Sequence, residues 1–344
     1  MFHKTMSRAL LAAALVVSAV TAQAETITMA MVTVGDPGNA ADTTGYGAVG
    51  YTFQMGKYDV TTSQYAAFLN AVAQTADPCG LYNSCMTLDL PTVGIAQSGS
   101  PGSYSYSVTG TAAGKNNMPM FDVTWGDAAR FSNWLQNGQP NAPEGNGTTE
   151  TGAYTLNGAV TISALMAITR NAGATYFIPS ENEWYKSAYY KGGSTNAGYW
   201  TYPTQSNTAP INTLPDTGNH ANFYDYYDTG NGGYTDPTNY LTPVGAFSAS
   251  PGPYGTFDQG GDVYQWNETP VSGLFRCLRG GSYYYNTSIS LASSSRYLLD
   301  PVGQDMNYVG FRVASSAASP EPGGIAMLLA GALAFGIWRL RRNA

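Results

Sequence analysis

The chain contains the stretch Val123-Thr124-Trp125-Gly126-Asp127-Ala128-Ala129-Arg130-Phe131, followed by Asn133-Trp134-Leu135. Thr124 and Asp127 have the spacing of a helix start, where each side chain can cap a backbone N–H of the first turn. Phe131, Trp134 and Leu135 then share one face, and Gly138 is a typical helix stop. The stretch therefore predicts a helix over about 125–137 with one apolar face in a core.

Two further stretches predict helices. In residues 61–74 the apolar side chains recur at the spacing i, i+3, i+4 and i+7, at Tyr65, Phe68, Leu69 and Val72. In residues 181–190, Ser180 and Glu183 form a capping box and Gly192 ends the helix. We expect three short helices as the regular frame of the domain.

Most of the remaining chain favours short strands and loops. Short apolar pieces at 51–55, 176–178 and 309–313 stand between clusters of Gly, Pro and Asn. Residues 138–175 and 192–243 carry no regular pattern and are long enough to have a functional role. The pattern predicts an α+β domain, loop-rich with few short helices and strands.

The composition excludes several classes of protein. The 344 residues carry a net charge of −7, and only 11% are charged, against about 25% in a typical soluble domain. At 43% hydrophobic residues the chain is too apolar to be disordered, and it is too acidic to bind nucleic acid through phosphates. With His3 in a leader, His220 alone remains, which excludes a three-histidine metal site.

Residues 1–24 are typical of a secretory signal peptide. Lys4 and Arg8 precede a short apolar run, and Ala22-Gln23-Ala24 is a small-residue cleavage pattern. A true membrane anchor is the alternative, but the run is shorter than the roughly 20 residues of a comfortable span. We expect Sec translocation and a mature chain that starts near Glu25.

Residues 317–344 predict a sorting or anchor segment. Pro320-Glu321-Pro322 precedes an apolar helix over 323–338, which ends in Arg339, Arg341 and Arg342. This order resembles the PEP-CTERM sorting signal of Gram-negative bacteria, which implies processing by an exosortase. The protein would be held transiently in the inner membrane through this transmembrane helix, then reach the cell surface or the extracellular matrix. An ordinary single-pass tail anchor is the alternative.

The body between the two ends is more acidic than the whole chain. It keeps 10 Lys and Arg against 21 Asp and Glu, a net charge of −11. Such a body suits cations, neutral sugars or proteins as partners.

Cys79 and Cys85 bracket a loop of five residues. In an oxidising compartment this spacing favours a disulfide, with a redox pair as the alternative. Cys277 is left over and fits a buried thiol.

Seven ordered blocks together carry a family resemblance. They are Met55 to Thr61 with Tyr65 to Asn70, Val123 to Leu135, Ile178 to Trp184, Pro243 to Gly245, Gly261 to Trp266, Leu278 to Ser282, and Gly310 to Arg312. The chain resembles the sulfatase-modifying-factor family, also called formylglycine-generating-enzyme-like, over about residues 27–315. The resemblance implies one domain over 25–316 with a C-type-lectin-like fold.

The family's oxidase chemistry is not expected here. Active members oxidise a sulfatase cysteine with copper held by two cysteines shortly after the Gly-Gly-Ser block. At those positions this chain has Tyr285 and Ser290. Because Cu(I) prefers thiolate ligands, we expect neither copper nor the family's catalysis. The histidines used by the iron-dependent relatives are missing as well.

The family's two calcium positions carry over in part. The resemblance places the first at Asn222, Phe223, Asp236 and Thr238, and the second at Asp258, Gly261, Val263 and Gln265. Oxygen donors of this kind suit calcium. Gln265 stands where the family has Glu, which weakens the second position. Ordinary loop capping by Asn and Asp is the alternative for both.

The segment that replaces the catalytic cysteines is rich in Tyr, Ser, Asn and Thr. Such side chains form adaptable binding surfaces. We expect ligand contacts from Ser282, Tyr283, Tyr284, Tyr285, Asn286 and Arg296. The alternative is that these residues pack within the fold. Arg279, Arg296 and Arg312 are also expected to hold loops through carbonyls and acids.

Three functions therefore stay open. The favoured one is an exported, non-catalytic domain that binds an exopolysaccharide or a surface protein. The others are a formylglycine-generating oxidoreductase and a surface receptor with a tailored groove.

Overall fold

The computed structural model describes residues 26–227, 230, 232–284, 287–303 and 306–316. Both the expected signal peptide and the expected C-terminal apolar helix lie outside these ranges, as do Tyr285 and Asn286. In the part that is described, no helix is both long enough and apolar enough to cross a membrane.

All three helices expected from the sequence are present. They are α1 (Thr62–Val72), α3 (Trp125–Gln136) and α5 (Glu181–Tyr189). Each begins with a complete capping box, formed by Thr61 with Gln64, Thr124 with Asp127, and Ser180 with Glu183. These reciprocal hydrogen bonds satisfy N–H groups that the helix itself leaves unpaired, so each start is determined locally.

Shorter helical pieces complete the helical part of the described chain. They are α2 (Cys85–Leu88), α4 (Ile162–Met166) and the 3-10 turns η1 (Lys115–Asn117) and η2 (Ser288–Leu291). The expected loop at 138–175 therefore contains one short helix, which Thr161 caps by accepting the N–H of Ala164.

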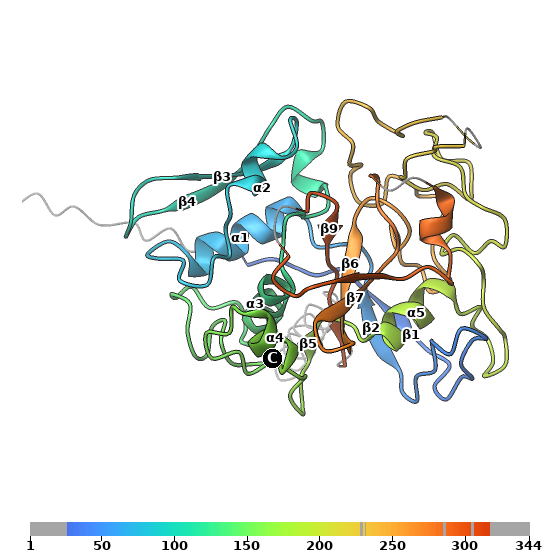
Figure 1. Cartoon of the computed structure of the whole chain (residues 1–344), viewed down its shortest axis with the longest axis horizontal. Coiled ribbons are helices and arrows are strands. Elements are labelled where there is room, and N and C mark those ends of the chain that lie inside the picture. Colours follow the sequence, from blue (N-terminus) through green and yellow to red (C-terminus); the bar gives the residue numbers. More distant parts are fainter. Residues whose placement is uncertain (1–25, 228–229, 231, 285–286, 304–305, 317–344) are drawn as a thin grey trace, which may run out of the picture.

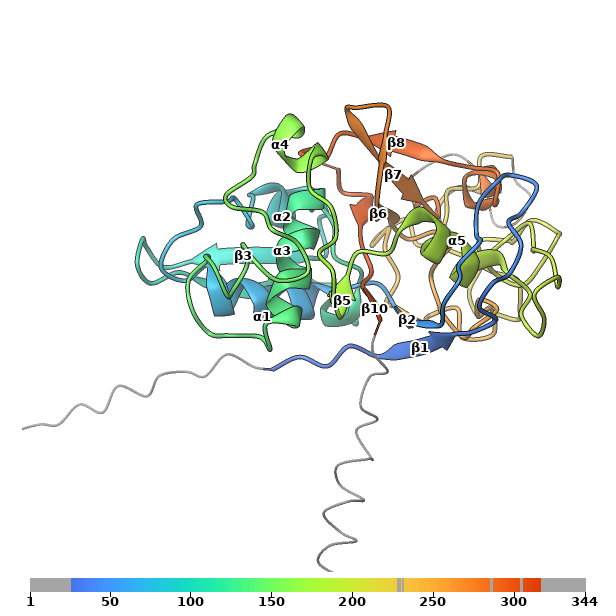
Figure 2. The ribbon, with the colours of Figure 1, turned by 90° about the horizontal axis from the view of Figure 1, so that it is seen from below.

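One four-stranded sheet joins the two ends of the described chain. Its order is β1 (Met31–Val34), β2 (Phe53–Gly56), β10 (Ala314–Ser315) and β5 (Tyr176–Phe177), with every neighbour antiparallel. Ala314 pairs with Met55 on one side and with Phe177 on the other. Figure 2 shows this sheet from the side, with β1 and β2 below α5.

A second sheet carries the strands nearest the candidate site. Its order is β8 (Tyr297–Leu299), β7 (Phe275–Arg279), β6 (Tyr264–Val271) and β9 (Val309–Gly310), with β9 parallel to β6. A separate hairpin consists of β3 (Gly94–Ser98) and β4 (Ser105–Thr109). In Figure 1 this hairpin lies with α1 and α3, while β6, β7 and α5 form the other half of the molecule.

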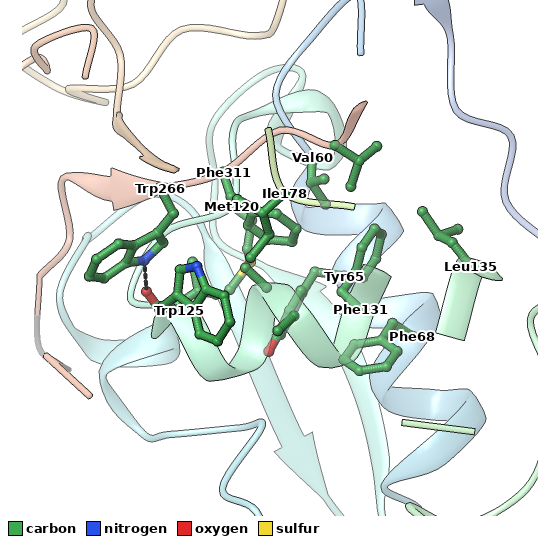
Figure 3. Packing of buried hydrophobic residues seen from close by; sticks show 14 of the residues in the cluster. Val60, Tyr65, Phe68, Met120, Trp125, Phe131, Leu135, Ile178, Trp266 and Phe311 are labelled. Carbon is green, nitrogen blue, oxygen red and sulfur yellow. Dashed lines mark hydrogen bonds between the residues drawn. The ribbon is translucent and has the colours of Figure 1, made fainter. Parts of the chain in front are cut away.

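The main core surrounds α3, almost all of whose residues are buried. The Phe131 ring lies 5.4 Å from that of Phe68 and 5.3 Å from that of Phe311. Figure 3 shows these rings together with Trp266, whose Nε1 donates to the carbonyl of Val123 at 2.9 Å. The apolar face predicted from the opening stretch thus contacts both helix α1 and Phe311, which lies between β9 and β10.

The long segment 192–243 has no helix or strand among its described residues, as expected. Buried side chains hold it instead. Asn212 donates from Nδ2 to the carbonyls of Phe223 (3.1 Å) and Gly233 (2.8 Å), so it joins distant turns of the segment. The α+β class with few short elements is confirmed.

Candidate functional site

A tight turn after β7 positions the candidate surface. Gly280 and Gly281 adopt φ values of 103° and 73°, which disfavour any other residue. A Cβ on Gly280 would lie 2.7 Å from the carbonyl of Gln259, and one on Gly281 would lie 2.7 Å from Oγ of Ser290. The turn leads into Tyr283, whose N–H donates to the carbonyl of Asp262 at 2.8 Å.

Tyr283 and Tyr284 have different roles, although they are adjacent. Tyr283 is buried, and its hydroxyl donates to Oδ1 of Asn307 at 2.8 Å. Tyr284 is 50% exposed, and its ring stacks on that of Tyr308 at 5.4 Å with an interplanar angle of 7°. The buried Ser282 and Tyr283 therefore support the surface, which Tyr284 and Tyr308 form.

A cluster of tyrosines lies behind this pair. Tyr240 lies 5.7 Å from Tyr283 and 4.8 Å from Tyr234, and Tyr234 lies 4.7 Å from Tyr224, measured between ring centroids. The last two contacts are edge-to-face, the favoured geometry for aromatic pairs. Sequence reasoning did not find Tyr308 or the tyrosines of 224–240; the total of 26 tyrosines was the one available signal.

The positions expected for a copper site hold no thiol in the sequence. Ser290 lies in η2, and its Oγ donates to the carbonyl of Thr287 at 2.9 Å. Cys277 is buried on β7 and accepts from Nε of Arg296 at 3.4 Å. His220 is engaged through both ring nitrogens by Thr213 and Thr217.

At the first calcium position one donor is unpaired. Asn222 is buried, and its Nδ2 donates to Oδ1 of Asp262 and to the carbonyl of Tyr240, at 2.7 and 2.8 Å. Its Oδ1 has no hydrogen-bond partner. A buried amide oxygen without a donor is costly unless a cation or water meets it. Asn222 therefore fits a hard cation, which carbonyl and carboxylate oxygens also bind.

The other members of this position are engaged in turns. The carbonyl of Phe223 accepts a hydrogen bond from Nδ2 of Asn212 at 3.1 Å. Its second lone pair could bind a cation. The Asp236 carboxylate accepts the N–H groups of Thr238 and Asn239, at 2.9 and 3.0 Å. This geometry corresponds to the loop capping considered as the alternative, so Asp236 would have to rearrange to bind a cation.

At the second calcium position Gln265 is fully engaged. Its Oε1 accepts from Nε1 of Trp184 and Nε of Arg312, both at 2.6 Å, and its Nε2 donates to the carbonyl of Asp258 at 2.7 Å. Gln265 has no oxygen left for a cation in this arrangement. Asp258 differs, because Oδ2 accepts from the N–H of Gly245 while the buried Oδ1 has no partner.

Gly261 and Val263 link the two calcium positions. Gly261 pairs with Asn222 in a parallel bridge, and a Cβ on Gly261 would lie 2.2 Å from the Asn222 carbonyl. Val263 is fully buried in the cluster that contains Tyr283. The cation positions and the tyrosine surface therefore share one packed unit.

Two buried carboxyl groups in this unit have raised pKa values. Burial raises the pKa of Asp258 to about 6, and burial with the Asp258 charge raises the pKa of Asp262 to about 7. Asp262 accepts from Thr242 N and Oγ1, at 2.8 and 2.7 Å. A bound cation would offset the charges of both carboxylates.

The arginines near the site are engaged by an acid and by loop carbonyls. Arg279 binds the buried Glu181 with Nε and Nη2, at 3.0 and 2.6 Å, and donates to the carbonyls of Ser293 and Ser295. Arg296 binds the other Glu181 oxygen at 2.6 Å. The Arg296 guanidinium, expected to meet a ligand, is thus held by Glu181 and is only 27% exposed.

The expected disulfide is not formed in the structure. Cys79 and Cys85, both in the described part of the chain, are not joined. The Cys79 thiol instead donates to Oε1 of Glu150 at 3.7 Å, while Cys85 begins α2. Burial raises the pKa of Cys79, and the same region contains Glu144, whose pKa burial raises to about 8. The contact with the loop after α3 was invisible in the local cysteine spacing.

Comparisons with known proteins give one family and several similar solved structures. The family profile for the sulfatase-modifying factor enzyme 1-like domain matches residues 24–317. Among solved structures, CarF is similar with a TM-score of 0.46 and 19% identity, over 85% of this chain and 99% of that one. Treponema denticola variable protein 1 has a TM-score of 0.48 and 16% identity, over 86% and 98%. PvdO from Pseudomonas aeruginosa has a TM-score of 0.42 and 17% identity, over 84% and 92%. No curated protein sequence matches the chain.

Proposed function

The chain belongs to the sulfatase-modifying factor enzyme 1-like family, and on that premise we propose that it is a binding protein and not an oxidase. We further propose that its fold is C-type-lectin-like. The protein is exported and presented at the cell surface or in the exopolysaccharide matrix. The ligand is a glycan or a protein, and the binding surface centres on Tyr284 and Tyr308.

The stacked pair of Tyr284 and Tyr308 is the observation that supports this proposal. Half of Tyr284 is exposed although its ring is held parallel to a neighbour, so the pair offers a rigid aromatic platform. Such a platform loses little conformational entropy on binding and presents apolar faces with hydroxyl edges. Sugar rings and extended peptides have complementary surfaces of this kind.

The loss of oxidase chemistry rests on residue identity. Tyr285 and Ser290 stand where the family's copper-binding cysteines would be, and a phenol and an alcohol are poor ligands for Cu(I). The alternative function, a formylglycine-generating oxidoreductase, predicts turnover of a cysteine-containing sulfatase peptide after copper loading. Turnover by the purified protein would overturn the binding proposal.

Calcium is proposed as a structural cofactor at the Asn222 position. The unpaired Oδ1 of Asn222 supports it, while the engaged Gln265 argues against a second ion at the Asp258 position. In the calcium-loaded protein, the melting temperature should fall when a chelator removes the ion. An unchanged melting temperature would exclude both positions.

Two assays test the binding surface. The mature protein is titrated with matrix polysaccharide extract, and a glycan array is probed with the mature protein. Tyr284→Ala should weaken binding about tenfold, which corresponds to about 1.4 kcal/mol. Tyr284→Phe keeps the stacked ring and should bind nearly as the original chain does. Tyr51 is also 50% exposed, so Tyr51→Ala is the matched control and should leave binding unchanged.

Export is tested separately at the two ends of the chain. Secretion by the Sec pathway predicts a mature N-terminus near Glu25, and exosortase processing predicts loss of the segment after Pro320-Glu321-Pro322. Intact-mass measurement of surface and matrix fractions distinguishes this from a tail anchor, which would retain Arg339, Arg341 and Arg342.

A further inference from the structure

A group of possible metal ligands lies away from the tyrosine surface and the calcium positions. Cys79, Glu144 and Glu150 place one sulfur and two carboxylate oxygens within 4.8 Å of one another. They come from two segments, the loop that follows α1 and the loop that follows α3. Neither segment belongs to the seven blocks of the family resemblance.

Backbone hydrogen bonds bring the two glutamates together. The Glu144 N–H donates to the carbonyl of Val72 at the end of α1, at 3.2 Å. The carbonyl of Gly145 then accepts the N–H groups of three successive residues that end at Glu150, at 2.9–3.1 Å. This compact turn holds both carboxylates beside the Cys79 thiol.

The two glutamates differ in how their charges are compensated. Glu150 forms a bidentate ion pair with Arg130, at 2.6 and 3.1 Å, and accepts the N–H of Gly158 at 2.6 Å. Glu144 has no such partner. Both of its carboxylate oxygens are shielded from solvent and form no hydrogen bond of regular geometry in the described chain, although Cys79 and Asp77 lie beside them. A buried carboxylate without a donor or a counter-charge is strongly disfavoured.

We propose that Cys79, Glu144 and Glu150 bind one zinc ion. With Cys79 as thiolate, the three ligands sum to a charge of −3, which Arg130 and a divalent ion together offset. The neighbouring Asp77, whose carboxylate accepts the N–H groups of Leu81 and Tyr82, adds one further negative charge. A thiolate with carboxylates suits zinc, whereas calcium, a hard cation, takes oxygen ligands alone. The orphaned Glu144 carboxylate is the observation that points to a missing ligand.

A fourth ligand position is available for water. A cavity of about 40 Å³ adjoins the group and is lined by Cys79, Asp127 and Arg130 among others. That space is large enough for a water molecule. Zinc with three protein ligands and one water has its usual coordination number of four. The ion would join the loops after α1 and α3, which approach each other through these side chains.

The experiment uses the mature chain, stripped with a chelator under mild reduction and then titrated with Co²⁺. Thiolate bound to Co²⁺ gives a charge-transfer absorption in the near ultraviolet, which reports this site and not the calcium positions. We expect one Co²⁺ per chain, displaced by Zn²⁺ in competition. Cys79→Ser should abolish the band, and Glu144→Gln should weaken Co²⁺ binding at least tenfold.

Two controls keep the result decisive. Cys85→Ser removes the alternative disulfide partner but leaves the three ligands, so it should keep the band. Glu144→Gln removes an uncompensated charge, so the metal-free variant should melt no lower than the original chain. Absence of the band in the original chain, or its persistence in Cys79→Ser, would overturn the proposal. A Cys79–Cys85 disulfide in exported protein that binds no Co²⁺ would overturn it as well.

Discussion

Replacement of Arg312 by Met is the sharpest test of how the two halves of the fold are joined. The guanidinium is fully buried and donates to Oε1 of Gln265 (2.6 Å), to the carbonyls of Gly56 and Phe257 (both 2.8 Å) and to Oδ1 of Asp59 (3.3 Å). The Arg312→Met change keeps most of the side-chain volume and removes every one of these donors.

The expected cost follows from what the change leaves behind. Asp59 is completely buried, its second oxygen has no partner, and burial raises its pKa although Arg312 lowers it. Removal of one member of a buried ion pair costs about 3–5 kcal/mol, because the other charge stays uncompensated. The Arg312→Met protein should therefore be destabilised by about 3–5 kcal/mol.

Urea unfolding followed by tryptophan fluorescence measures this cost. With a slope of about 3 kcal/mol per M, the upper end of the usual range, the midpoint should fall by about 1–1.7 M. The double variant with Asp59→Asn should recover part of the loss, since the orphaned charge is then absent. Lys191→Met removes an exposed cation that lies over Trp200, and it should cost at most about 1 kcal/mol. A loss below about 1 kcal/mol for Arg312→Met would refute the reasoning.

Three further outcomes are expected. Phe131→Ala opens a cavity at the centre of the core and should lower the free energy of unfolding by about 3–5 kcal/mol in the same urea assay, with retained stability as the contrary result. With a chelator present, the melting temperature should fall as the pH rises from about 4 to 7. The reason is that the folded state holds protons on Asp258 and Asp262 that the unfolded chain releases near pH 4. Added calcium should flatten this dependence, and a melting temperature that rises with pH would contradict the prediction. Alkylation of denatured, unreduced protein should modify both Cys79 and Cys85, and a cross-linked peptide would show that the pair oxidises after all.

The helices were predictable because their signals are local. Thr61, Thr124 and Ser180 each form the capping box that the spacing implied, and the helices begin at the next residue. The irregular segment 192–243 was predictable for the same reason, since it lacks any period that a strand or helix requires. The hairpin of β3 and β4 was not found, because its strands contain few large apolar residues.

The candidate site was predictable in part. The sequence predicted Tyr284 as a ligand contact, but it did not distinguish this exposed ring from the buried ring of Tyr283. The difference depends on how the turn at Gly280 directs the two side chains toward or away from the neighbouring loops. Tyr308 is distant in the chain and reaches Tyr284 through the pairing of β9 with β6. The Cys79 contact with Glu150 was likewise hidden, because a loop after α3 supplies the partner.

The sequence by itself determined the helix starts, the loop-rich α+β class, the family resemblance and the absence of cysteines at the copper positions. Each depends on residue identity or on spacing within a few residues, where hydrogen-bond geometry and periodicity act directly. The tertiary structure alone decided which tyrosines are exposed, that Gln265 is engaged by Arg312, and that the Glu144 carboxylate is shielded from solvent without an ion-pair partner. These depend on contacts between segments far apart in the chain, whose energies are set by packing and desolvation.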